Sequence, residues 1–586
     1  MNFCDFKRQY YLLIVGIFLL LCGEVSFAQD IEGVIKAPIL TSNGGLSLSQ
    51  ISTFIPGDTT GRADPYTYYL AGNVNFSLFS VVNVPVSFAY TNNQLNKDAS
   101  MPFNRFSIAP SYKWIKVYAG YSSMTFSPYT LVGHELFGGG VELTFESGLK
   151  VSAIYGRMKK EVKRDSVNTE AIYKRMGGGF KIEHSSKFAD IGFNIYKAKD
   201  VPNASFYSVG DSAVVAPMDN IAGSLFLDIK IIESVKFNVE YAISAINSDI
   251  SRTDSLSHSV KDRFVEQNGD LAIHHAVKAG VSQSSSIGVI GATYERVSPN
   301  YNTFGAYYFV NDYENITANF STSIKKRVNL AADVGYQRDN LSDQKLNSSN
   351  RLIYSTNISS MITKKLNVGV SYSNLKSYMH IKEVYSELTA TNPYQNLDTL
   401  SFTQLNLTTS CNANYTLVSS KESRQSINGV FTYQEASEQQ KNESKFAGNR
   451  IYNSVLSYQY SRIPQKFNAS TSVNYNHNQL PAGYMGVFSY NISLQKAFFE
   501  KLKVSFIGTY SRSFNDTMNL AKIVNLRIGA GYTFVKRHNF NLSLAEVFNQ
   551  GVKKTSTQYS VNLTYSYMFD FNVQRKEKKT KFQGNF

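Results

Sequence analysis

The chain has 586 residues, of which 43% are hydrophobic, 13% aromatic and 18% charged, and its formal net charge at pH 7 is +15. This composition excludes an intrinsically disordered chain, and three cysteines in so long a chain exclude a disulfide scaffold. Tyrosine and phenylalanine, with 39 residues each against a single tryptophan, are typical of a chain rich in half-exposed strands.

The first 28 residues have the layout of a secretory signal peptide. Lys7 and Arg8 give a basic start, residues 11–21 are apolar, and residues 26–28 form a small-residue cleavage site. We therefore predict that residues 1–28 are a signal peptide, cleaved after Ala28.

Cys22 raises the alternative of a lipoprotein signal. Leu21 precedes this cysteine, where lipoprotein processing usually takes a small side chain, so cleavage after Ala28 is favoured. That cleavage leaves Cys411 without another cysteine to pair with inside the chain. We therefore expect stability to come from burial and hydrogen bonding.

A period-two alternation of apolar and polar residues repeats along the rest of the chain. There is no run of about 18 apolar residues after residue 28, so we expect no membrane-spanning helix. Successive strand side chains point to opposite faces, so each alternating segment has one apolar and one polar face. In the last segment, Tyr559, Val561, Leu563, Tyr565, Tyr567 and Phe569 share one face, while Ser560, Asn562, Thr564 and Ser566 share the other.

Alternation alone fits a soluble sandwich as well as a membrane barrel. A sandwich of this length would divide into domains with linkers, and no such change in composition appears. In an outer-membrane barrel the apolar faces look out to lipid and the polar faces line a wet interior. We therefore predict an all-β fold, a large transmembrane antiparallel up-and-down β-barrel over residues 45–570 in the cell outer membrane. A short periplasmic segment, 29–44, would precede it, and a basic periplasmic tail, 571–586, would follow.

The connections predict the number of strands. Short turns alternate with longer polar links of uneven length, as periplasmic turns alternate with extracellular loops in such barrels. Twelve short turns pair twenty-four strands, and one strand near 45–53 and one near 559–569 make about 26, with a range of about 22 to 28. The predicted turns lie at 81–85, 113–115, 146–149, 184–187, 232–235, 282–286, 325–327, 363–366, 419–423, 463–466, 499–502 and 535–538.

Most of the 13 prolines fall in the predicted turns and links. This placement fits the prediction, because proline removes a donor from the strand ladder and a closed barrel has no edge strand to hold it. Pro110, close to the end of a predicted strand, is the exception.

One stretch carries a detailed resemblance to a known group. It runs from Pro102-Phe103-Asn104 through Phe126-Ser127-Pro128-Tyr129-Thr130 to Gly133-His134-Glu135. It is similar to a segment in uncharacterised outer-membrane β-barrel proteins of the Bacteroidota, which the export signal and hairpin array also resemble. The resemblance implies an outer-membrane barrel and carries no catalytic or binding residue. Energy-coupled nutrient receptors of that group place a plug domain before a 22-stranded barrel, whereas residues 29–44 are too few for a plug.

A barrel of this width without a plug would leak, because 16 to 18 strands already leave an aqueous channel. We expect the bore to be narrowed by inward-folded loops, by a flattened cross-section or by another chain. The candidate inward loops are 199–217, 247–270 and 377–399, and the alternative for each is extension into solvent.

The positive charge does not indicate nucleic-acid binding, because the basic residues are scattered and no nucleic-acid-binding module appears. The expected partners are outer-membrane lipid and lipopolysaccharide, and a plug or secreted protein chain. We predict that five lumen-lining residues set any ionic preference, with ordinary wall lining as the alternative. They are Asp190, Lys236, Glu240, Asp333 and Lys503.

No sequence motif for nucleotide binding, metal binding or nucleophilic catalysis occurs, so we expect no enzyme, no cofactor and no metal. Glycines at 138–140 and 177–179 fall in strand patterns and indicate close backbone approach. The predicted function is a transport or secretion conduit. The alternative is a non-conducting surface scaffold that holds an extracellular or periplasmic partner, and an embedded lipid-cleaving enzyme is disfavoured.

Overall fold

The structure is a computed structural model. It describes residues 38–57, 65–92, 104–162, 172–202, 216–251, 270–307, 309–343, 350–374, 377–380, 402–405, 407–436, 449–480, 483–499, 501–535, 537–552 and 554–573. Every element named in these ranges is a strand. Within them, no helix is long and apolar enough to cross a membrane.

The strands follow one another along the chain, joined by short turns and by longer links. The first sixteen are β1 (Leu40–Phe54), β2 (Tyr66–Leu78), β3 (Val82–Thr91), β4 (Arg105–Ile108), β5 (Ser111–Tyr112), β6 (Ile115–Thr125), β7 (Val132–Thr144), β8 (Leu149–Lys159), β9 (Lys174–Ser185), β10 (Ala189–Val201), β11 (Asp219–Ile232), β12 (Val235–Asn247), β13 (Leu271–Ser284), β14 (Val289–Val297), β15 (Tyr313–Ile324) and β16 (Val328–Asp339). The others are β17 (Asn350–Thr363), β18 (Leu366–Ser373), β19 (Ser377–His380), β20 (Phe402–Leu405), β21 (Leu407–Ser419), β22 (Ser423–Ala436), β23 (Asn449–Arg462), β24 (Phe467–Leu480), β25 (Gly483–Phe498), β26 (Leu502–Asn515), β27 (Asn519–Phe534), β28 (His538–Gly551) and β29 (Thr555–Val573).

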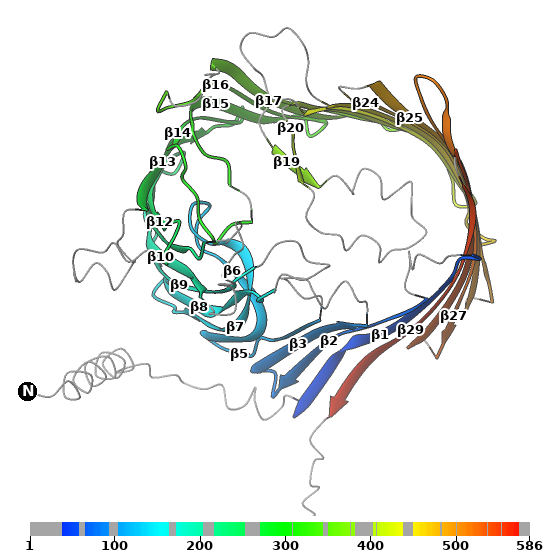
Figure 1. The fold of residues 1–586 in the computed structure, drawn as a ribbon, viewed down its shortest axis with the longest axis horizontal. Coiled ribbons are helices and arrows are strands. Elements are labelled where there is room, and N and C mark those ends of the chain that lie inside the picture. Colours follow the sequence, from blue (N-terminus) through cyan, green and yellow to red (C-terminus); the bar gives the residue numbers. More distant parts are fainter. Residues whose placement is uncertain are drawn as a thin grey trace, which may run out of the picture.

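All of these strands except β19 and β20 form one closed antiparallel barrel (Figure 1). The sheet contains 27 strands, but β4 and β5 share one place between β3 and β6, so the ring has 26 positions. The first and last strands close it, with an unbroken register from Leu40↔Val573 to Phe54↔Tyr559. The predicted fold class and strand number are confirmed. The ladder reaches slightly beyond the expected range 45–570 at both ends.

The twelve predicted short turns all join consecutive strands of the ring. They lie at one end of the barrel, where β1 also begins and β29 ends, and the longer links lie at the other end. The predicted turn at 81–85 is wrong in its bounds. The strands leave only residues 79–81 between them, and Pro85 lies inside β3.

Two prolines share one interruption of the ladder. Pro110 separates β4 from β5, and Pro85 of the neighbouring β3 lies opposite this break, since β3 pairs with β4 as far as Val86 and with β5 from Asn83. The amide of Ala109 still donates to the carbonyl of Pro85 at 3.0 Å. A closed barrel therefore holds two prolines in its wall by setting both against the same gap, where neither needs to donate.

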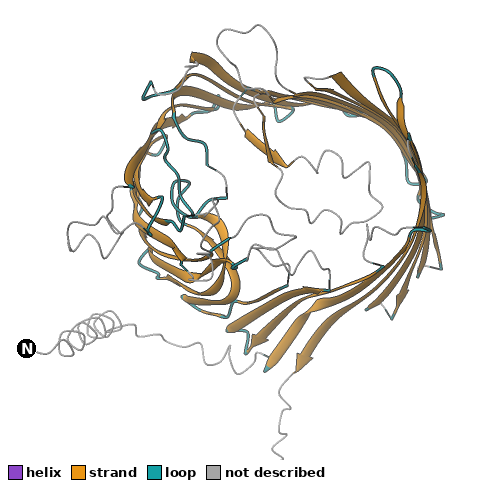
Figure 2. Ribbon diagram, in the orientation of Figure 1, coloured by secondary structure: helices purple, strands orange, loops and turns teal. Residues whose placement is uncertain are grey.

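The short strands β19 and β20 pair with each other in a separate two-stranded sheet and take no part in the ring. Figure 1 shows this pair within the outline of the barrel. Most of the three links expected to fold inward, 199–217, 247–270 and 377–399, lies outside the described residues. Figure 2 shows that other loops, in the sector from β6 to β15, turn into the ring.

One face of each strand is apolar and exposed, and the other is polar and hydrogen-bonded. On β29, Val561 and Leu563 are 42% and 44% exposed. Between them in the alternation, Asn562 and Thr564 make side-chain hydrogen bonds with Ser49 of β1, and the hydroxyls of Ser49 and Thr564 lie 2.7 Å apart. An apolar band facing out and a polar wall facing in are the properties of an outer-membrane-type barrel.

The outward face of β29 gives a test of this arrangement. Leu563→Arg places a charge in the apolar band and should lower the free energy of unfolding by about 2–4 kcal/mol. Ser560→Arg, on the polar face of the same strand, should change it by less than about 1 kcal/mol. Urea unfolding of the barrel in phospholipid bilayers measures both, and equal losses would contradict the assigned faces.

Candidate functional site

The end of the β6–β7 hairpin leaves the barrel wall. The pairing of β4 with β6 stops at Gly120, and that of β7 with β8 stops at Phe137, while β6 and β7 stay paired up to Thr125 and Val132. Residues 121–136 therefore have no strand neighbour from the wall on either side.

Gly120 marks the point where the hairpin departs from the wall. Its φ is +90°, and a Cβ there would lie 2.1 Å from the carbonyl oxygen of Phe106. Only glycine tolerates both this left-handed backbone and this close approach. The glycine at this position therefore allows the hairpin to leave the wall here.

The loop between β14 and β15 packs against this hairpin end inside the ring (Figure 1). The hydroxyl of Tyr301 donates to the carbonyl of Tyr129 at 2.8 Å, and that of Thr303 donates to the carbonyl of Thr130 at 2.7 Å. The two segments come from distant parts of the chain and form one unit. We call residues 121–136, 298–307 and 309–312 the inner wedge.

Polar side chains of the wall anchor the inner wedge. The Thr130 hydroxyl donates to Asn194 on β10 at 2.6 Å, and the Phe304 amide donates to Asn220 on β11 at 3.0 Å. Asn194 and Asn220 are fully buried. Because the inner wedge lies within the ring, these contacts identify the polar strand face as the inner wall.

Carboxylates of the inner wall also accept hydrogen bonds from hydroxyls of the inner wedge. Ser127 donates to Glu240 of β12, and the Tyr129 hydroxyl donates to Glu295 of β14 at 2.6 Å. In the register between them, Lys278 of β13 pairs with both Glu240 and Glu295. The inner wedge is therefore fixed over a row of alternating charges.

Burial keeps the wedge tyrosines protonated. Desolvation raises the pKa of Tyr129 well above its ordinary value, and the neighbouring Glu295 adds to the effect. Desolvation, with a contribution from Glu240, also raises the pKa of Tyr301. Both phenols therefore remain hydrogen-bond donors at neutral pH and well above it.

Apolar side chains fill the space between the inner wedge and the wall. Gly179 on β9 makes room for Phe126, because a Cβ at this glycine would lie 2.7 Å from the Phe126 ring. This agrees with the close approach that the glycines at 177–179 predict. The larger buried cluster contains Met124, Phe126, Leu131, Leu136, Ile154, Met158, Tyr196, Ala198 and Phe304.

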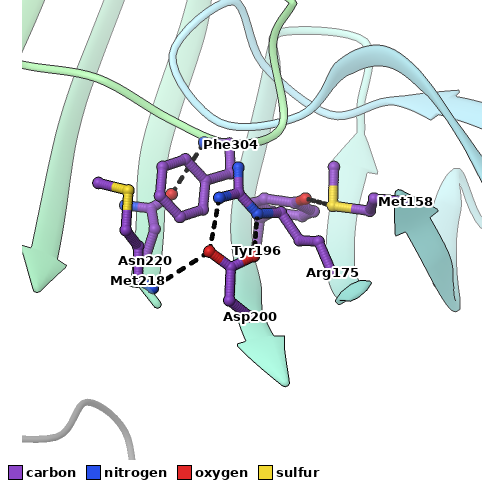
Figure 3. Close-up of polar contacts among 7 residues, drawn as sticks. All are labelled: Met158, Arg175, Tyr196, Asp200, Met218, Asn220 and Phe304. Carbon is purple, nitrogen blue, oxygen red and sulfur yellow. Dashed lines mark hydrogen bonds and ion pairs between the residues drawn. The ribbon is translucent and has the colours of Figure 1, made fainter. Parts of the chain in front are cut away.

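A buried ion pair supports the tip of the β14–β15 loop (Figure 3). Arg175 of β9 binds both carboxylate oxygens of Asp200 on β10, at 2.7 and 2.9 Å, and the two side chains are 13% and 6% exposed. The guanidinium carbon lies 3.8 Å from the centre of the Phe304 ring. The Met218 amide donates to the same carboxylate at 3.1 Å. The Asp200 carboxylate thus orients the Arg175 guanidinium, which the β14–β15 loop covers.

The five predicted lumen-lining residues are dispersed over the inner wall. Glu240 lies under the inner wedge, and Asp333 accepts a hydrogen bond from Ser355 at 2.6 Å. Asp190 pairs in register with Asp228, while Lys236 and Lys503 lie near the short-turn end of β12 and β26. The structure does not bring these residues together into one site. Their role in an ionic preference stays a prediction.

The wedge segments are not among the inward loops predicted from the sequence, although the sequence carries a signal for them. Residues 127–131 and 298–305 both begin Ser-Pro, continue through tyrosine and threonine, and are rich in aromatic residues. Links that extend into solvent are usually polar, so aromatic residues in a link indicate burial. Across the residues that the structure describes, no group of three or more His, Cys, Asp or Glu is placed to hold a metal ion.

The ion pair gives a test of wedge anchoring. Asp200→Leu leaves Arg175 buried without its partner and should lower the free energy of unfolding by about 3–5 kcal/mol. Arg175→Leu combined with Asp200→Leu removes both charges and should recover most of that loss. Denaturant unfolding measures the stability, and hydrogen exchange of residues 298–307 reports the loop. A double variant as unstable as the single would contradict this role.

No protein-family model and no curated protein matches this sequence. Among solved structures, the chain is similar over 90% of its length to the P pilus usher translocation pore, with a TM-score of 0.34, 8% identity and 99% of that chain covered. It is similar over 90% to the siderophore receptor PirA from Acinetobacter baumannii, with a TM-score of 0.40, 9% identity and 80% of that chain covered. It is similar over 91% to a ferric enterobactin receptor, with a TM-score of 0.41, 9% identity and 82% of that chain covered. At these scores the fold assignment rests on the strand pairing described above.

Proposed function

We propose that this chain, exported by a cleaved signal peptide, is an outer-membrane conduit whose bore is narrowed by the inner wedge. Its cargo would be polar solutes or a secreted polypeptide. The observation that carries the proposal is a closed ring of 26 positions with an apolar outer face and a polar inner face. Polar side chains such as those of the inner face line the interior of water-filled barrels.

The inner wall away from the inner wedge supports a wet bore. Gln459, Asn468 and Gln495 are exposed on neighbouring strands. They line a hollow of about 580 Å³. Exposed amides on an inward face are stable where water reaches them. This sector therefore fits the open side of a conduit.

The inner wedge supports narrowing because it reaches deep into the barrel. Asn194 lies near the middle of β10 and Glu240 near the middle of β12, and both bind wedge hydroxyls. The wedge therefore occupies one side of the bore at mid-depth. We also propose a plug or secreted partner chain in the remaining bore, with lipid and lipopolysaccharide around the outer face.

Conductance tests the proposal. The protein in planar bilayers should show a steady open level. Replacing residues 127–131 with an Asn-Gly turn should raise that level severalfold, because the tip of the inner wedge is gone. The same turn in place of residues 516–518, in a link at the same end of the barrel, serves as the control and should change little.

Heat-shifted gel mobility establishes that each variant is folded. A folded protein without a steady open level, both with and without the wedge tip, would contradict a conduit and support the non-conducting scaffold.

A further inference from the structure

The inner wall carries two sectors of different chemistry. On the sector from β7 to β16, charged side chains of both signs face inward. They include Glu142, Lys150, Lys181, Glu183, Asp190, Lys236, Glu240, Lys278, Glu295 and Asp333. Of the described inner positions on β21–β27, only Arg424, Lys503 and Arg527 carry a charge, and none is acidic. The second sector carries mainly hydroxyls and amides, with some apolar residues among them, such as Val430, Val455 and Ile507.

The register arranges these neutral groups in two continuous rows. Directly paired residues share a face, so each row lies on the inner wall. The first row crosses β21–β25 through Thr416, Ser426, Gln459, Ser470 and Ser493. The second crosses β21–β27 through Asn414, Asn428, Ser457, Ser472, Asn491, Thr509 and Asn525. We call these twelve residues the amide track.

The amide track is long and reachable. Seven adjacent strands at a spacing of about 4.8 Å give it a length of roughly 30 Å. Its members are half-buried or exposed. Asn414 and all five residues of the first row line the hollow of about 580 Å³. An extended ligand can therefore contact several rungs at once.

We propose that the amide track binds an uncharged oligosaccharide during its passage, an inference that rests on the proposed conduit. Serine, threonine, asparagine and glutamine both donate and accept hydrogen bonds, as sugar hydroxyls do. An acidic or basic solute would lose hydration here with few opposite charges to compensate it. A repeating ligand suits a repeating track.

The inner wall also holds acceptors that lack donors. Beside the amide track, the side-chain oxygens of Asn474 and Asn476 are buried and have no hydrogen-bond partner among the described residues. Asn474 pairs in register with Ser489, whose hydroxyl lies 2.8 Å from that of Ser511. Buried acceptors without partners are uncommon in folded proteins. Both oxygens are closed to solvent, so a ligand would reach this wall through the exposed and half-buried members of the track.

The composition of the track itself disfavours a polypeptide as its ligand. None of its twelve members is apolar or aromatic. A peptide would have to set its apolar side chains against amides and hydroxyls. Hydrogen bonds without ring stacking also make each contact weak, which suits a site that a ligand must leave.

The test uses maltohexaose as an uncharged probe. It should interrupt the open current of the protein in planar bilayers, and titration calorimetry on detergent-purified protein should show binding. Asn428→Leu combined with Gln459→Leu removes two exposed or half-buried amides of the track. This variant should bind at least fivefold more weakly, because each lost hydrogen bond costs a fewfold in affinity, while heat-shifted gel mobility shows that it is folded.

Asn329→Leu is the matched control, since it removes an inner-wall amide on β16, outside the track. It should leave binding unchanged. The inference is overturned if maltohexaose does not bind, if the control weakens binding as much as the track variant, or if an acidic oligosaccharide or an uncharged peptide of equal length binds more tightly. If the protein binds maltohexaose but shows no open current, the proposed conduit is contradicted and the proposed sugar site is not.

Discussion

The structure depends on the closure of the strand ladder between β1 and β29. Hydrocarbon offers no hydrogen bonds, so a spanning sheet is stable only when its first and last strands satisfy each other. The pairing of β1 with β29 starts at Leu40 and Val573 and continues without a break, so it meets this requirement over the full length of β1. Closure also fixes which face of every strand looks outward, because one slip of register would exchange all the faces.

The need to satisfy every backbone hydrogen bond also governs the inner wedge. A hairpin can leave a closed wall only where its lost ladder contacts are replaced, and residues 121–136 exchange them for contacts with the β14–β15 loop and the inner wall. Amides and carboxylates of the inner wall accept hydrogen bonds from both segments, and the Arg175–Asp200 pair lies against the Phe304 ring. The result is a polar inner wall with one sector covered by the wedge, while the amide track lies on the sector of β21–β27.

The sequence predicted the barrel well because alternation and turn chemistry are local properties. The turns around Lys325 and Lys466 have positive φ at these lysines, and such tight returns leave a clear polar signature. The wedge could not be found in this way, since the contacts between its two segments join residues more than 160 positions apart, such as Tyr129 with Tyr301. Pro85 was misplaced for a related reason. Its tolerance depends on Pro110 in the neighbouring strand, and no local pattern shows the register in which two neighbouring strands pair.

Disulfide cross-linking of the two closing strands tests the central claim most directly. Ser47 and Ser566 are register partners on β1 and β29, and their hydroxyl oxygens lie 3.4 Å apart. In a chain whose Cys411 is replaced by serine, Ser47→Cys with Ser566→Cys should form a bond within single molecules in the membrane, seen as a redox-dependent shift on denaturing gels. Failure of this pair to cross-link, or cross-linking only between molecules, would contradict a barrel closed by its first and last strands.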